Sequence, residues 1–141
     1  MQQALNQHQM HNRILAVDDE PDQLEMIRLF LQSEGFEVNT SSDGADALAK
    51  VGTVRPHLIL VDASMPRMNG FTFCEAIRKN PATAKIPIIM VTGLHTHFAR
   101  LNSLGHGAND FLMKPFVPNE LLKKINALLH PSANSAVPRP A

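Results

Sequence analysis

The chain has 141 residues, of which 44% are hydrophobic and 18% are charged. This size and balance are typical of one globular domain with a substantial hydrophobic core, and they exclude a wholly disordered, collagen-like or coiled-coil chain. Thirteen Lys and Arg residues offset thirteen Asp and Glu residues, so the formal charge is zero. Because there is no basic excess, we expect this domain to bind neither nucleic acid nor an anionic membrane.

The chain has a single cysteine, Cys74, which excludes an internal disulfide and a multi-cysteine zinc site. A chain with one unpaired cysteine is compatible with a reducing compartment. No apolar run reaches the roughly 18 residues of a membrane span. The Gln- and His-rich segment 1–12 has no apolar stretch of the kind found in signal peptides. We therefore expect a cytoplasmic protein.

Apolar runs and helical patterns alternate along the chain. In chain order they predict a strand at 13–17, a helix at 21–34, a strand at 36–40, a helix at 43–51, a strand at 57–61, a helix at 70–79, a strand at 86–91, a helix at 95–104, a strand at 110–113 and a helix at 119–129. The runs at 14–17, 58–61 and 88–91 are apolar without alternation, which is typical of parallel strands covered by helices on both faces.

This alternation predicts a doubly wound (βα)₅ domain of the α/β class, with one five-stranded parallel sheet and right-handed crossovers. The predicted domain spans residues 13–130. Residues 1–12 are polar and residues 131–141 are rich in Pro, Ala and Ser, so we expect flexible tails, of which the second could serve as a linker. The sequence shows no internal repeat and no second domain.

Polar residues follow four of the predicted strands. Asp18 and Asp19 follow the first strand, Asp62 the third, Thr92 the fourth and Lys114 the fifth. Because the carboxyl ends of parallel strands lie at one edge of a sheet, these side chains are expected to converge. Crowded carboxylates raise one another's pKa unless a cation lies among them, and oxygen ligands with room for water favour Mg²⁺ over Ca²⁺.

Such a site has the groups that aspartyl phosphorylation needs. With Mg²⁺ among the carboxylates and Lys114 opposite them, one carboxylate can attack a phosphoryl donor in line while the cations absorb the charge on the phosphoryl oxygens. The pattern therefore predicts phosphorylation of an aspartate at this edge of the sheet.

Four motifs resemble one known family. They are V-D-D-E at 17–20, D-A-S-M-P-R-M-N-G at 62–70, V-T-G at 91–93 and G-A-N-D-F-L-M-K-P-F at 107–116. Together they make the chain similar to the receiver domain of two-component response regulators over roughly residues 13–129. The resemblance implies a flavodoxin-like sheet of strand order 2-1-3-4-5. It also implies a phosphoacceptor in signal transduction, which catalyses only its own aspartyl phosphorylation and dephosphorylation.

The resemblance assigns roles to the acidic residues. Asp62 would be the phosphoacceptor and a ligand of Mg²⁺. Asp19 would bind Mg²⁺ directly, Asp18 mainly through water, and Ser64 through its backbone carbonyl.

Three further positions would respond to the phosphoryl group. Thr92 would hydrogen-bond one phosphoryl oxygen, and Lys114 would pair with another. Phe111 stands where the family carries a Tyr or Phe ring that turns inward when the threonine moves. The bond before the family's proline, here Pro115, is often cis, and the sequence leaves the isomer open.

Partners are implied by the same resemblance. A sensor histidine kinase or a phosphotransfer protein would supply the phosphoryl group, and a downstream effector or a fused output domain would respond to it. Segment 95–104 contains no acid, so half of the charge pairing that dimeric relatives use is missing. We expect a monomer before phosphorylation.

Two other functions compete with this interpretation. A flavodoxin-like electron carrier or a P-loop nucleotide-binding protein would have a similar topology, but the loop 18–22 holds four acids and no glycine, whereas phosphate cradles need exposed backbone N–H groups. A receiver-like interaction module would keep the fold without phosphorylation. The five expected residue types disfavour that module, and incubation with a small phosphodonor and Mg²⁺ would decide between the two.

Some neighbouring residues have simpler interpretations. Glu20 is predicted to stabilise the start of the first helix, Asn69 to cap the third helix and Cys74 to pack in the core. His95 and His97 lie two positions apart, which is a poor spacing for a metal site on a helix. We interpret them as residues of a solvated helix start.

Overall fold

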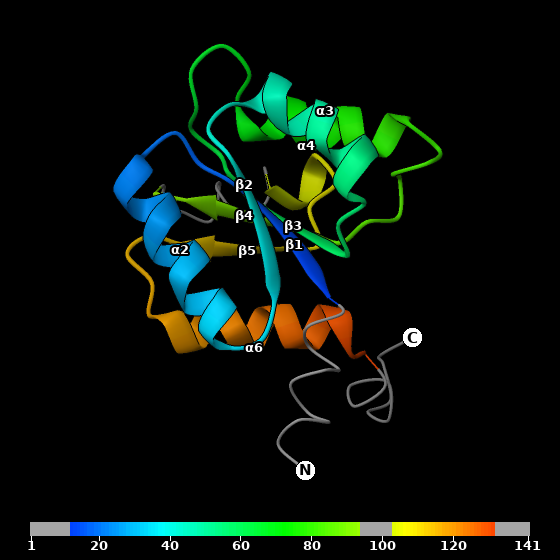
Figure 1. Cartoon of the computed structure of the whole chain (residues 1–141). Helices are drawn as coiled ribbons and strands as arrows, with labels where there is room; N and C mark the ends of the chain where they lie inside the picture. Colours follow the sequence, from blue (N-terminus) through cyan, green and yellow to red (C-terminus); the bar gives the residue numbers. More distant parts are fainter. Residues whose placement is uncertain (1–11, 94–102, 132–141) are drawn as a thin grey trace.

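The computed structural model describes residues 12–93 and 103–131 of the chain. In this part, five strands form one parallel sheet in the order β2-β1-β3-β4-β5 (Figure 1). The strands are β1 (Arg13–Val17), β2 (Glu37–Ser41), β3 (Leu58–Asp62), β4 (Ile88–Thr92) and β5 (Asp110–Met113). The predicted α/β fold and its strand order are confirmed.

Helices cover both faces of the sheet. They are α2 (Pro21–Ser33), α3 (Gly44–Val54), α4 (Gly70–Lys79) and α6 (Pro118–Leu129). Figure 1 shows α3 and α4 on one face and α2 and α6 on the other. The longest of these, α2, has 13 residues, and no described helix has the length and apolar character needed to cross a membrane.

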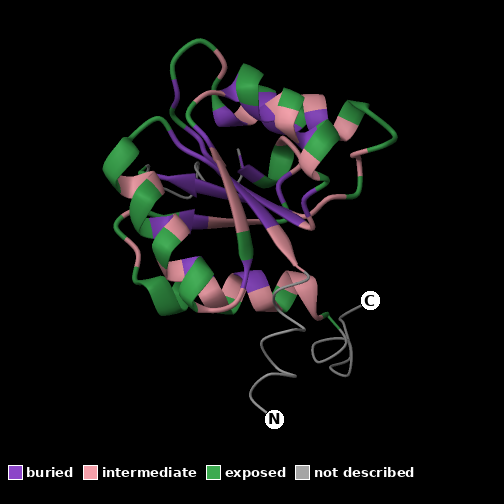
Figure 2. Cartoon of the chain, viewed as in Figure 1, coloured by how far each residue is buried: buried purple, intermediate pink, exposed green. Residues whose placement is uncertain are grey.

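The core consists of two layers, one on each face of the sheet. Leu15 and Val17 of β1 belong to the cluster under α3 and α4, whereas Ile14 and Ala16 belong to the cluster under α2 and α6. All four side chains are buried, and Figure 2 shows buried residues along the strands between the two helix layers. The apolar runs without alternation are therefore strands buried on both faces, as predicted.

The register of the sheet brings four strand ends to one edge. Val17 pairs with Val61, the neighbouring Asp62 pairs with Val91, and Thr92 pairs with Met113. Because all the strands run in the same direction, the residues that follow β1, β3, β4 and β5 emerge together. This edge carries the predicted site.

The start of α4 is pressed against the end of β3. The Asn69 side chain caps α4 by accepting a hydrogen bond from the Thr72 backbone N–H at 2.9 Å, as predicted. A Cβ atom on Gly70 would lie 2.4 Å from the carbonyl oxygen of Asp62, so only glycine fits there. This close approach fixes the loop that follows Asp62.

Some element ends differ from the prediction. Helix α3 continues three residues past the predicted end at Val51, because the Arg13 guanidinium donates to the carbonyls of Val54 and Arg55 and satisfies its C-terminus. Strand β4 begins at Ile88 rather than 86, since Pro87 has no N–H for the ladder. The predicted helix 95–104 lies mostly outside the described residues, and so do most of both predicted tails.

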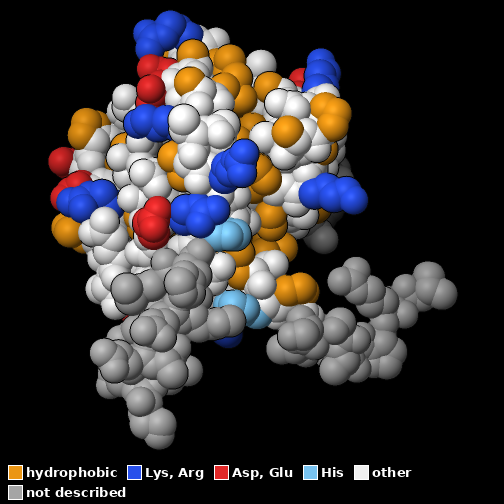
Figure 3. All heavy atoms as spheres, turned by 45° about the vertical axis from the view of Figure 1, so that its right-hand side comes forward, with side chains coloured by type: hydrophobic (Ala, Val, Ile, Leu, Met, Phe, Trp, Pro, Cys, Tyr) orange, Lys and Arg blue, Asp and Glu red, His pale blue; other side chains and the backbone are white. Residues whose placement is uncertain are grey.

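Charged side chains are dispersed over the face in Figure 3. Lys and Arg side chains stand among hydrophobic and uncharged surface, and Asp or Glu side chains lie beside some of them. Ion pairs in the described part include Arg28 with Glu25 and Lys124 with Asp110. The described residues of this face form no continuous basic stripe of the kind that follows a nucleic acid backbone.

Candidate functional site

Asp62 is a buried carboxylate at the end of a central strand. It is the last residue of β3, and only 4% of it is exposed. Its Oδ1 accepts a hydrogen bond from the Ser64 backbone N–H at 3.1 Å, and its Oδ2 accepts one from Lys114 Nζ at 3.1 Å. Both carboxylate oxygens are therefore held by hydrogen-bond donors, one of which is the charged Lys114 ammonium.

Lys114 is the cation of the site. Its backbone N–H donates to the carbonyl of Thr92 at 2.7 Å, which holds the residue at the sheet edge just after β5. Burial alone would lower the pKa of Lys114, but the hydrogen bond and charge of Asp62, the charge of Asp18 and the hydrogen bond to Glu20 raise this pKa. The ammonium group therefore stays charged. The bond from Lys114 to Pro115 is cis.

Asp18 is the second buried carboxylate. It follows β1, it is 3% exposed, and its Oδ2 lies 3.6 Å from Lys114 Nζ. Burial is the main reason why the pKa of Asp18 rises to about 6. The hydrogen bond from the Glu20 backbone N–H and the charge of Lys114 lower this pKa, and the charge of Asp62 raises it. The buried pocket thus disfavours the ionised form of Asp18.

The other two acids of this loop take different places. Asp19 is exposed. Among the described residues, the carboxylates that gather within 4.8 Å of one another are those of Asp18, Glu20 and Asp62. Glu20 precedes α2, as predicted, but its side chain makes no capping hydrogen bond and lies 3.4 Å from Lys114 Nζ. The sequence feature that could have indicated a place for Glu20 in the site is its position as the third consecutive acid after β1.

This donor set fits a hard divalent cation. Three carboxylates supply only oxygen donors, and two of them are buried close together. The raised pKa of Asp18 indicates that the pocket would gain from a further positive charge. No histidine or cysteine belongs to such a cluster within residues 12–93 and 103–131.

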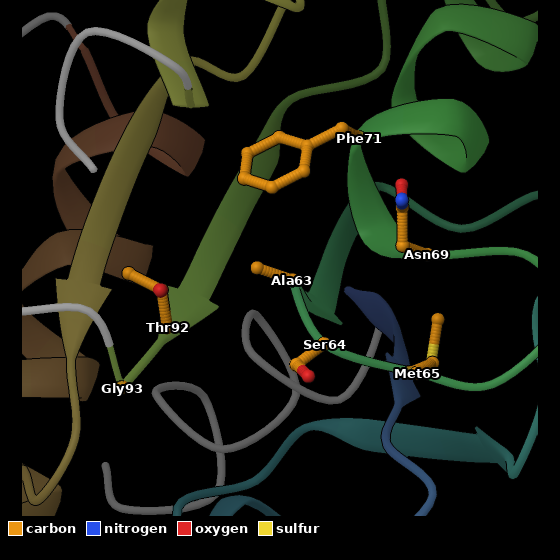
Figure 4. Close-up of a pocket in the computed structure, with 7 residues that line it drawn as sticks. All are labelled: Ala63, Ser64, Met65, Asn69, Phe71, Thr92 and Gly93. Carbon is orange, nitrogen blue, oxygen red and sulfur yellow. The ribbon is translucent and has the colours of Figure 1, made fainter. Parts of the chain in front are cut away.

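A hollow of about 480 Å³ adjoins the end of β3 (Figure 4). Its lining comes from the loop after β3, the start of α4 and the end of β4, and consists of Ala63, Ser64, Met65, Asn69, Phe71, Thr92 and Gly93. Figure 4 shows the Phe71 ring extending over this space and Thr92 at its opposite side. The hollow leaves room for a group bound beside Asp62.

The two predicted switch residues lie on neighbouring strands. Thr92 ends β4 and is 1% exposed. Phe111 lies on β5 opposite Met90, two residues before the partner of Thr92. The half-buried Phe111 ring packs against the core under α3 and α4, and Lys124 Nζ lies 5.9 Å from its centroid.

Several other predicted residues have structural roles. Cys74 is fully buried, and burial raises the pKa of its thiol to about 11, so it is a core residue as predicted. His106 lies 3.6 Å from Glu75 and stacks at a tilt against Phe71, with ring centroids 5.0 Å apart. His95 and His97 lie outside the described residues.

Comparison with known proteins identifies similar chains. The family model for the response regulator receiver domain matches residues 14–126. The DNA-binding response regulator MtrA of Mycolicibacterium smegmatis is 40% identical over 85% of this chain and 51% of its own length. The alkaline phosphatase synthesis transcriptional regulatory protein PhoP of Bacillus subtilis is 35% identical over 90% of this chain and 52% of its own. The chain therefore spans about half the length of these relatives.

Two solved structures share this fold over nearly all of their own length. The chemotaxis protein CheY4 of Vibrio cholerae is 37% identical, with a TM-score of 0.80, and the match covers 84% of this chain and 98% of that one. The signal receiver domain of a signal transduction histidine kinase from Syntrophus aciditrophicus is 32% identical, with a TM-score of 0.78, covering 92% and 95%.

Proposed function

Because the chain belongs to the response regulator receiver domain family, we propose that it is the phosphoacceptor of a two-component signalling system and that Asp62 receives the phosphoryl group. One observation carries this proposal. The buried Asp62 carboxylate lies 3.1 Å from the Lys114 ammonium and beside the second buried carboxylate of Asp18. The domain acts as a signalling switch and catalyses only its own phosphorylation and dephosphorylation.

The proposed reaction is a displacement at phosphorus. An Asp62 carboxylate oxygen forms a bond to phosphorus, the bond from phosphorus to the donor breaks, and the donor leaves with the electron pair. Lys114 and the Ser64 backbone N–H hold the carboxylate in one orientation before the attack. The Lys114 ammonium offsets the negative charge that gathers on the phosphoryl oxygens.

Mg²⁺ is the proposed cofactor. The residues that would hold it are Asp18, Asp19 and Asp62, together with the backbone carbonyl of Ser64. When bound, the ion would supply positive charge against the phosphoryl oxygens and the crowded carboxylates. The oxygen-only donors of the pocket and the raised pKa of Asp18 support this choice.

The proposed switch involves Thr92 and Phe111. Once Asp62 is modified, the Thr92 hydroxyl would donate a hydrogen bond to one phosphoryl oxygen, while Lys114 pairs with another. The hollow between the end of β3 and the end of β4 gives Thr92 space to move (Figure 4). Phe111, two register positions away on β5, would follow this movement.

The proposed phosphodonor is a sensor histidine kinase or a phosphotransfer protein that docks beside Lys114. A hollow of about 430 Å³ opens there, and its lining consists of Gln23, Met26, Lys114, Pro115 and Phe116. Met26 in this lining is 40% exposed, and Val117, which follows Phe116 in the chain, is 62% exposed. Exposed apolar side chains next to the site favour protein docking that brings a phosphohistidine to Asp62.

The proposed output is a change of partner binding. MtrA is named as a DNA-binding response regulator and PhoP as a transcriptional regulatory protein, and this chain covers only about half of the length of each. We infer that this domain controls either a separate effector or an attached output domain, and that it makes no nucleic acid contact itself. It is proposed to be monomeric before phosphorylation.

A single incubation separates this function from a receiver-like module that has lost phosphorylation. The protein is mixed with acetyl phosphate and Mg²⁺, and its intact mass is measured, with a chelator-treated sample as the control. We expect a mass increase of one phosphoryl group that needs Mg²⁺. An unchanged mass in both samples would support the phosphorylation-independent module.

A further inference from the structure

We propose that Glu20 restrains the phosphorylation of Asp62 by holding a negative charge against the Lys114 ammonium at the mouth of the site. This inference rests on the proposed function and adds a residue that sets the response to anionic phosphodonors. Glu20 acts through Lys114 and is therefore a positioning residue.

The ammonium of Lys114 is shared among three carboxylates. Its Nζ lies 3.1 Å from Asp62, 3.4 Å from Glu20 and 3.6 Å from Asp18. The side chains of Asp62 and Asp18 are 5% and 4% exposed, whereas that of Glu20 is 67% exposed. Glu20 is therefore the outer carboxylate, on the side from which a donor must approach.

The backbone of Glu20 is fixed on both sides. Its N–H donates to Asp18 Oδ1 at 2.9 Å, and its carbonyl accepts from the Leu24 N–H at 3.0 Å in the first turn of α2. The Glu20 side chain makes no capping hydrogen bond to α2 and pairs instead with Lys114. The position of this charge is thus set by the start of α2 and does not depend on a flexible loop.

A negative charge at this position has two effects of opposite sign. It repels an approaching phosphoryl donor, which is anionic, and it occupies a hydrogen of Lys114 that would otherwise be open to a phosphoryl oxygen. The same charge attracts a divalent cation to the cluster, since the three carboxylates lie within 4.8 Å of one another. Its removal should therefore speed phosphorylation and weaken Mg²⁺ binding, whereas damage to the fold would impair both.

The test compares Glu20→Gln with the matched variant Glu25→Gln. Glu25 lies on the same helix and is exposed, but it pairs with Arg28 away from the site. The second-order rate constant for phosphorylation by acetyl phosphate is measured at saturating Mg²⁺ and low ionic strength, and Mg²⁺ affinity is measured separately from amide shifts in an NMR titration of the unphosphorylated protein.

We expect Glu20→Gln to raise the rate constant by about three- to tenfold and to lower the Mg²⁺ affinity by a similar factor. Glu25→Gln should change neither. The gain in rate should shrink at about 0.5 M salt, where charges are screened within a few ångströms.

Three results would overturn the role of Glu20. They are a Glu20→Gln rate no higher than wild type, an equal rise in Glu25→Gln, or a rise that is unaffected by salt and leaves Mg²⁺ affinity unchanged. Absence of labelling in the wild-type protein would instead overturn the proposed function itself, so the two failures are distinguishable.

Discussion

The ammonium nitrogen of Lys114 lies 3.1 Å from Oδ2 of Asp62, although the two residues are 52 positions apart and β4 lies between their strands. The contact depends on the sheet edge, because the Lys114 N–H is bonded to the carbonyl of Thr92 and the Lys114 side chain reaches across β4. A cation and a buried carboxylate are thereby held together before any ligand arrives. The catalytic arrangement proposed here depends on this pair.

Asp18 should destabilise the protein near neutral pH when no metal is bound. Folding raises the pKa of Asp18 from 3.8 to about 6. Below about pH 4 the carboxyl is protonated in both the folded and the unfolded state, so its burial carries no charge penalty. As the pH rises through 6, the buried carboxyl must ionise and the free energy of unfolding falls. In chelator at pH 7, the free energy of unfolding of Asp18→Asn should therefore be about 1–3 kcal/mol higher than that of wild type. This difference should vanish near pH 4.

Urea unfolding at both pH values measures this effect. The control is Asp19→Asn, which removes an exposed charge from the same loop and should change the free energy of unfolding by less than about 0.5 kcal/mol. A destabilised Asp18→Asn protein at pH 7, or an equal gain in the control, would contradict the burial argument.

The response of stability to Mg²⁺ tests the assignment of Asp19 as a ligand. A ligand that binds only the folded state stabilises it by mass action, by about 2.7 kcal/mol at a concentration one hundred times the dissociation constant. Millimolar Mg²⁺ should raise the melting temperature of the wild-type protein. Asp19→Asn should gain much less, although its melting temperature in chelator is close to wild type. An equal Mg²⁺ gain in this variant would remove Asp19 from the proposed ligands.

Arg78 should stabilise the segment that precedes β5. Its guanidinium donates to the carbonyls of Gly107, Ala84 and Ile86 at 2.8–3.0 Å, and to the Asn109 side chain at 2.8 Å. Lysine cannot supply this fork of donors, so Arg78→Lys should lower the free energy of unfolding by about 2–3 kcal/mol.

The matched control for Arg78 is Arg28→Lys. Arg28 pairs with the exposed Glu25 on α2, and the change should cost less than about 1 kcal/mol. Equal losses in urea unfolding of the two variants would mean that the carbonyl contacts of Arg78 do not stabilise the fold.

Thr92 should couple phosphorylation to the segment before β5. Thr92→Ala should still be labelled, since the hydroxyl is not the nucleophile, but residues 103–107 should lose their phosphorylation-induced amide shifts. Thr92→Ser, which keeps the hydroxyl, should retain them. NMR spectra before and after labelling measure both variants, and full shifts in Thr92→Ala would show that the signal does not pass through Thr92.

The fold could be predicted from the sequence because each strand is a local apolar run. Ile14 to Val17, Leu58 to Val61 and Ile88 to Val91 are buried on both faces, and that burial is encoded by consecutive residues. The end of α3 could not be predicted in this way. Its last carbonyls are satisfied by Arg13, more than 40 positions away, and a local pattern carries no sign of that contact.

The site was predictable to the extent that strand ends determine it. Asp18, Asp62 and Lys114 meet at the sheet edge as their positions after β1, β3 and β5 indicated. The pairing of Glu20 with Lys114 could not be predicted, since it depends on the direction in which one side chain leaves the start of α2. The capping preference of acidic residues near a helix start pointed instead to a local role.

The central claim is that Asp62 accepts the phosphoryl group, and the most direct test is labelling of Asp62→Asn. Wild type, Asp62→Asn and the control Asp46→Asn, which removes an exposed aspartate on α3, are incubated with acetyl phosphate and Mg²⁺ and weighed intact by mass spectrometry. We predict one added phosphoryl group in wild type and in Asp46→Asn, and none in Asp62→Asn. A phosphorylated Asp62→Asn protein would contradict the assignment.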